Sequence, residues 1–70
     1  MSIKKTYLKT WHIGFYNFQI FEINADGEKW LEASPMNHNT VTRTAESEAV
    51  LRIILENDVR NALNFYQKVR

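Results

Sequence analysis

The 70-residue chain has no cysteine, one proline and two glycines. Without cysteine it can form neither a disulfide framework nor a thiolate zinc site, a composition that suits a reducing compartment such as the cytoplasm. Two glycines are too few for a glycine-rich phosphate loop. No apolar run approaches the ~18 residues of a membrane span, and polar residues near the start argue against a signal peptide. We therefore expect a cytoplasmic protein without a membrane anchor.

The charge is nearly balanced, with nine basic and eight acidic residues and a net charge of +1. Nucleic-acid-binding domains usually show a clear basic excess, which is missing here. The hydrophobic content of 44% and the aromatic content of 13% exclude a disordered chain. Seventy residues are enough for one small domain with a thin core. The composition therefore predicts a single globular domain over residues 1–70.

The last third of the chain, residues 44–69, predicts one long amphipathic helix. Thr44 is a suitable N-cap, since its hydroxyl can accept a hydrogen bond from the first turn. A lone helix cannot bury its apolar stripe, which must pack on the preceding residues or on another molecule. The helix is longer than the strands before it, so we expect its last turn to overhang them with Phe65, Tyr66 and Val69. The stripe consists of Val50, Leu51, Ile54, Leu55, Val59, Ala62, Leu63, Tyr66 and Val69.

The first half of the chain predicts an antiparallel β-meander with strands at 3–13, 15–24 and 28–34. Apolar and polar residues alternate there, as in half-buried strands. The tetrapeptide Asn24-Ala25-Asp26-Gly27 fits a type I turn with a glycine bulge, which places Asn24 opposite Glu28. A loop over 35–43, with a possible short fourth strand at 40–42, leads to the helix. The predicted fold is therefore α+β, a three-stranded meander packed against one C-terminal helix.

This register gives the sheet two apolar faces, but a single helix can cover only one of them. If the helix covers the first face, the second is an exposed apolar patch of the kind that marks an interface. A bulge near Asn17 that turns both sets into one core is the alternative. The first face holds Phe15, Phe21, Ile23, Leu31 and Ala33. The second holds Tyr16, Phe18, Ile20 and Trp30 as partner-binding anchors, beside Glu22 and Glu32, which set specificity.

The sequence contains no recognisable catalytic, cofactor or metal site. His12 and His38 are the only histidines, and neither has a carboxylate at ligand spacing. Glu22 and Glu32 are predicted to share a flat sheet face, which lacks the cleft that acid–base catalysis needs. We therefore expect a protein that is not an enzyme and that binds no metal or cofactor.

The residues favour a small protein-binding module, such as a stoichiometric inhibitor or regulator of a larger complex. Proteins of this size and layout occur among phage and mobile-element inhibitors, which is an analogy at the level of fold. Self-association through the second face as a homodimer belongs to the same class. We expect Trp30→Ala and Phe18→Ser to abolish partner capture while leaving the fold intact.

A single-stranded nucleic-acid-binding domain is the alternative function. Aromatic residues on a sheet can stack bases, and nearby cations can contact phosphates. The glutamates predicted on the second face, Glu22 and Glu32, count against it because they repel phosphate. The cations that this alternative would use are Lys4, Lys5, Lys9 and Arg43.

Overall fold

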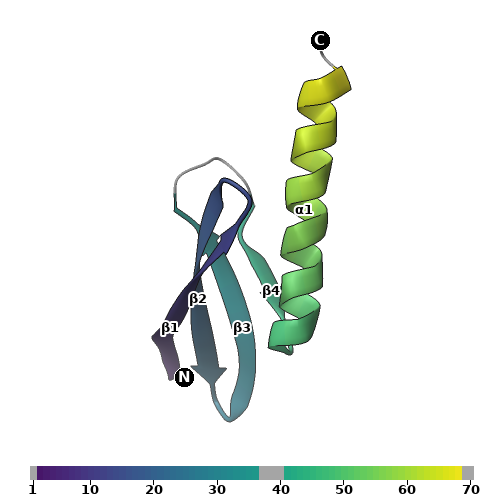
Figure 1. Cartoon of the computed structure of the whole chain (residues 1–70). Helices are drawn as coiled ribbons and strands as arrows, with labels where there is room; N and C mark the ends of the chain where they lie inside the picture. The colour runs from purple at the N-terminus through teal and green to yellow at the C-terminus, as the bar shows by residue number, and fades with distance from the viewer. Residues whose placement is uncertain (1, 37–40, 69–70) are drawn as a thin grey trace.

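The computed structural model describes residues 2–36 and 41–68, with side chains up to residue 62. Its elements are β1 (Ile3–Ile13), β2 (Tyr16–Ala25), β3 (Glu28–Pro35), β4 (Arg43–Ala45) and α1 (Glu48–Lys68). The four strands form one antiparallel sheet in the order β1-β2-β3-β4, and α1 packs on one side of it (Figure 1). The predicted α+β fold is confirmed. The short fourth strand lies at 43–45, not at 40–42, and residues 37–40 are outside the described part of the chain.

The turn between β2 and β3 contains only two residues, Asp26 and Gly27. Both have positive φ angles, 52° and 88°, as a type I′ turn requires. Hairpins favour this turn because its twist matches that of the flanking strands, and Asp-Gly is a preferred sequence for it because both central residues need positive φ. Ala25 consequently pairs with Glu28. The predicted pairing of Asn24 with Glu28 is wrong by one residue. A one-residue slip moves every side chain of β3 to the other face relative to β2.

A β-bulge divides β1 into two halves. Tyr7 pairs with Phe21 and Lys9 pairs with Ile20, which leaves Leu8 as the extra residue. Adjacent cross-strand pairs point to opposite faces. Because Leu8 is inserted between them, the odd-numbered residues before the bulge lie on one face and those after it lie on the other.

The apolar pattern of β2 changes face at the same level. Phe18 and Ile20 lie on the helix side, whereas Phe21 and Ile23 lie on the opposite side. The register irregularity lies in β1, whereas the sequence suggested a bulge near Asn17. Each end of the sheet therefore has its apolar residues on a different face.

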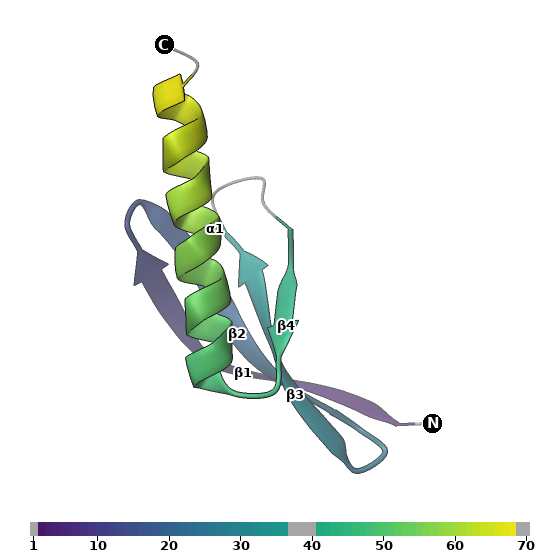
Figure 2. The ribbon, with the colours of Figure 1, turned by 90° about the vertical axis from the view of Figure 1, so that its right-hand side faces the viewer.

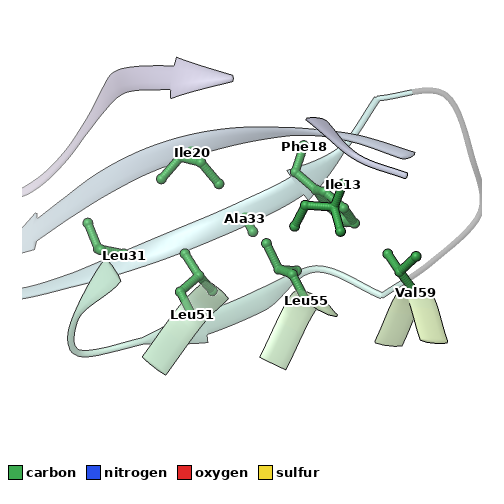
Figure 3. Packing of buried hydrophobic residues seen from close by; sticks show 8 residues of the cluster. All are labelled: Ile13, Phe18, Ile20, Leu31, Ala33, Leu51, Leu55 and Val59. Carbon is green, nitrogen blue, oxygen red and sulfur yellow. The ribbon is translucent and has the colours of Figure 1, made fainter. Parts of the chain in front are cut away.

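The core lies between the helix and the end of the sheet that follows the bulge (Figure 3). Phe18 is 1% exposed and Ile20 is fully buried. Tyr16 packs against the margin of the core. The predicted placement of these three residues on the open face is wrong, because the observed register puts Leu31 and Ala33 on the same face as Phe18 and Ile20, and the helix packs on that face. The core residues are Ile13, Phe18, Ile20, Leu31, Ala33, Leu51, Leu55 and Val59.

Ser47 caps the start of α1. Its Oγ accepts a hydrogen bond from the Val50 amide at 3.3 Å, and its carbonyl accepts one from the Leu51 amide at 3.0 Å. The predicted N-cap, Thr44, lies in β4. The acidic side chain of Glu48 follows in the first turn, where it interacts favourably with the helix dipole.

We expect Ser47→Ala to destabilise the domain by about 1 kcal/mol, because a helix amide loses its side-chain partner. Urea denaturation followed by circular dichroism measures the change. Thr42→Ala is the control, since Thr42 is exposed and precedes β4. If both variants unfold at the same urea concentration as the wild type, Ser47 does not act as a cap.

The molecule is elongated, with extents of 49 × 19 × 18 Å. The helix runs past the sheet at one end (Figure 1), and the β2–β3 hairpin runs past the start of the helix at the other (Figure 2). The part of β1, β2 and β3 at this end of the sheet, residues 3–7 and 21–32, is called the arm below. The sequence also predicted that Leu63, Tyr66 and Val69 continue the apolar stripe and that Phe65 overhangs the sheet with the last turn, but these side chains lie outside the described residues.

Candidate protein-binding surface

The arm has an apolar side that faces away from the helix. Cross-strand pairing sets its side chains in two adjacent rows, one through Ile23 and the other through Phe21. The first row is Lys5–Ile23–Trp30 and the second is Tyr7–Phe21–Glu32. Together with Ile3 near the end of the arm, these two rows are called the arm face below.

Side-chain contacts hold the arm face in a defined arrangement. The rings of Tyr7 and Phe21 meet edge to face, with centroids 5.9 Å apart and an interplanar angle of 72°. The Tyr7 hydroxyl shares a hydrogen bond with Thr10 Oγ1 at 2.7 Å. Lys5 Nζ lies 4.4 Å from the centre of the Phe21 ring and 2.8 Å from Glu32 Oε2. The aromatic groups are therefore positioned before any partner arrives.

The arm face is open to solvent. Ile3 is 65% exposed and Tyr7 is 52% exposed, whereas Ile23 between its neighbours is only 7% exposed. Phe21 and Trp30 are half-buried. Within residues 2–36 and 41–68, the only helix lies on the opposite side of the sheet. A contiguous apolar patch that a monomer leaves open in this way usually marks an interaction site.

The carboxylate of Glu32 is the least satisfied polar group of this surface. The side chain is 22% exposed and is paired with Lys5, which is 50% exposed. Its Oε2 atom is nevertheless buried and accepts no hydrogen bond from the described residues, so the contact with Lys5 is an ion pair without a directed hydrogen bond. Burial of a carboxylate oxygen in this state is unfavourable.

The structure separates the predicted anchors. Trp30 and Glu32 belong to the arm face, as their pairing with Ile23 and Phe21 shows. Tyr16, Phe18 and Ile20 face the helix, as described above. Glu22 also lies on the helix side, because it pairs with the core residue Leu31.

Glu22 borders a recess of about 220 Å³ beside the start of the helix. Leu8 and Leu31 form apolar walls, Glu46 and Glu48 supply further carboxylates, and Trp30, at the β3 edge of the arm, also lines the recess. The Glu48 carboxylate is already paired with Lys9. Two glutamates that were expected to share one surface, Glu22 and Glu32, are therefore on opposite sides of the sheet.

Sequence reasoning assigned Phe21 and Ile23 to the helix side and left Ile3 and Tyr7 out of the site. The Asp26-Gly27 dipeptide was the signal that could have corrected the first error, because a two-residue turn fixes the register observed here. The bulge in β1 has no comparable signal in the sequence. The inclusion of Tyr7 in the arm face therefore required the structure.

The cations proposed for nucleic-acid binding do not form one surface. Lys5 lies on the arm face and is paired with Glu32. Lys9 is on the helix side and is paired with Glu48. Lys4 pairs with Asn24, which lies two residues along β2 from Glu22 and therefore on the same, helix side of the sheet. Lys4 is thus on the same side as Lys9.

Arg43 holds β4 against the helix. Its Nε donates to Asp58 Oδ2 at 2.8 Å, and its Nη2 donates to Asp58 Oδ1 at 3.2 Å. Three of the four cations thus already have carboxylate partners. This arrangement does not favour the nucleic-acid alternative.

The histidines do not converge on a metal site in the described residues. His12 Nδ1 shares a short hydrogen bond with Asn17 Oδ1, and His38 lies outside the described residues. In residues 2–36 and 41–68 no three histidine, cysteine or acidic side chains cluster in a way that could hold a metal ion.

No helix in the described part of the chain is long and apolar enough to cross a lipid bilayer. No protein-family model matches the chain, and no curated protein or solved structure is detectably similar to it.

Proposed function

We propose that the chain is a small, non-enzymatic protein-binding module that docks on another protein through the arm face. One observation carries this proposal: the arm keeps an apolar side open to solvent, although the helix covers the other side of the sheet. Removal of apolar surface from water contributes about 25 cal/mol per Å². A docking partner gains this free energy from the arm, whereas an isolated chain does not.

The composition of the arm face also suits protein recognition. Tyr and Trp are enriched among the residues that dominate binding energy, and Tyr7 and Trp30 lie at opposite edges of this surface. The Tyr7–Phe21 contact and the Lys5–Glu32 ion pair hold the side chains in place. Such preorganisation lowers the entropy lost when a complex forms.

The partner should present an apolar patch with hydrogen-bond donors at its rim. The apolar patch would cover Ile3, Tyr7 and Trp30, and a donor would bind the exposed part of the Glu32 carboxylate, whose side chain is 22% exposed. A 70-residue chain that binds in this way acts by occupying a surface, which is the mode of a stoichiometric inhibitor or regulator of a larger complex. We place this interaction in the cytoplasm because the chain contains no cysteine.

Site-specific photo-cross-linking in the source cells tests this function. The photoreactive residue p-benzoylphenylalanine replaces Tyr7 on the arm face or, as the matched control, Phe15 in the β1–β2 turn. Phe15 is 88% exposed and lies in the turn at the other end of the sheet. We expect a covalent adduct with one defined protein from position 7 and not from position 15, identified by mass spectrometry. Identical adducts from both positions would contradict the proposal.

A further inference from the structure

We propose that, in the absence of its partner, the arm face binds the arm face of a second copy of this chain. This inference deepens the proposed function, since it names one occupant of the same surface. The arm face is self-complementary: its cation lies on β1 at one edge, and its carboxylate and indole lie on β3 at the other edge. A surface of this kind can pair with an identical surface about a two-fold axis.

A two-fold axis parallel to the strands gives the favourable arrangement. It stacks β1 of one copy over β3 of the other and keeps each cross-strand row over its equivalent. Lys5 then lies over Trp30 of the second copy, so that the indole can pack on the lysine stem while the ammonium stays beside Glu32 and Phe21 of its own chain. In the adjacent row, Tyr7 lies over Glu32 of the second copy. Phe21, half-buried at the centre of its row, packs against its own equivalent, whereas Ile23 is already buried between its neighbours.

The second two-fold arrangement, about an axis across the strands, is unfavourable. It stacks β1 on β1 and brings the Lys5 ammonium groups of the two copies towards each other. Like charges at an interface are repulsive. Charge therefore selects the axis parallel to the strands.

The proposed dimer also addresses the unsatisfied carboxylate. Glu32 Oε2 is buried beside Lys5, but the Glu32 side chain as a whole is 22% exposed. The hydroxyl of Tyr7 from the second copy is a suitable donor to the exposed part of this carboxylate, and among the described residues of its own chain it hydrogen-bonds only to the exposed hydroxyl of Thr10. Each dimer contains this contact twice by symmetry.

The size of the surface predicts a weak dimer. Seven residues from each copy form the arm face, whereas stable protein complexes use about 20–30 residues on each side. We therefore expect a dimer that forms at high concentration and dissociates on dilution. A larger partner surface can then displace the second copy.

Sedimentation velocity of the purified chain, from about 10 µM to about 1 mM, tests the dimer. We expect the wild type to shift from monomer to dimer over this range and Tyr7→Ser to remain monomeric. Phe15→Ser, the matched control at another exposed aromatic residue, should dimerise like the wild type. Circular dichroism verifies that all three chains are folded. A wild-type chain that stays monomeric, or a Tyr7→Ser chain that dimerises normally, would overturn the proposal.

Reversing the charges of Lys5 and Glu28 tests the direction of the two-fold axis. In the proposed arrangement Lys5 approaches the β3 edge of the second copy, where Glu28 lies two residues before Trp30 on the same face. Lys5→Glu and Glu28→Lys should each weaken self-association by about five-fold, as expected for an exposed ion pair. A mixture of the two variants should recover part of this loss. If the mixture associates no better than either variant alone, the arrangement with parallel strands is wrong.

The cross-linking experiment separates this inference from the proposed function. An adduct between position 7 and another protein, together with a monomeric purified chain, would support the function and overturn the dimer. Adducts between two copies alone would support the dimer and contradict the function.

Discussion

Replacement of Phe18 by alanine is expected to destabilise the domain by about 3–5 kcal/mol. The ring is 1% exposed and lies among the largest buried side chains, with Ile20, Leu51 and Leu55. Its removal loses the transfer free energy of the aromatic ring and leaves a cavity between sheet and helix. A domain of this size has a net stability of only a few kcal/mol. We therefore expect the variant to be largely unfolded at 25 °C.

Circular dichroism in urea measures this effect, and Phe15→Ala is its matched control. Phe15 is 88% exposed, so its truncation should change the free energy of unfolding by less than about 0.5 kcal/mol. The milder variant Phe18→Leu should remain folded with a measurably lower free energy of unfolding. It therefore provides a measurement if the alanine variant does not fold. A loss below about 1 kcal/mol for Phe18→Ala would place the ring at the surface, as the sequence pattern had predicted.

Replacement of Trp30 by alanine is expected to weaken partner binding by about 30-fold or more, the effect typical of an interface hot spot. The indole forms the β3 edge of the arm face and pairs with Ile23. It is half-buried in the free chain, so part of its surface remains available to a partner. Its removal should cost less stability than the loss of Phe18, because it lies outside the core cluster.

The yield of the cross-linked adduct from position 7 reports this loss, and calorimetry with the identified partner gives its magnitude. Ile53→Ala is the control, since Ile53 is 66% exposed on the helix and lies outside the arm face. This variant should bind the partner like the wild type. Equal binding by the Trp30→Ala chain would show that the partner does not use the arm face. Thermal unfolding of both variants excludes a global folding defect.

The two glutamates that were expected to set specificity lie on opposite sides of the sheet. Glu32 remains a candidate for partner recognition, because it belongs to the arm face and its side chain is 22% exposed. Glu22 faces the recess on the helix side. Only a partner that wraps around the edge of the arm could contact both glutamates.

The fold class follows from local patterns that sequence alone expresses. Leu51, Leu55 and Val59 recur at a spacing that only a helix can place on one side, and all three are buried. Alternation over residues 3–34 favours strands, and the short connections between them favour antiparallel neighbours. These signals depend on residues close together in the chain, so no tertiary information was needed.

The register was ambiguous because two hairpin turns fit the same tetrapeptide. Asn24 to Gly27 suits a type I turn with a bulge, and its last two residues suit a type I′ turn. The positive φ angles of Asp26 and Gly27 show that the second geometry forms. The two turns differ by one residue in the pairing of β2 with β3. This difference decides which residues of β2 lie on the same face of the sheet as Trp30.

The sequence alone determined that the strands carry more apolar surface than one helix can cover. Only the tertiary structure decided which side chains remain uncovered. The helix starts at Glu48, close to the end of the short strand β4, and it therefore covers only the end of the sheet that follows the Leu8 bulge. Before the bulge, the apolar side chains point to the other face. In β2 the apolar pattern itself shows this exchange of faces, whereas in β1 it arises from a pairing irregularity with β2, which is a non-local contact that the β1 pattern does not encode.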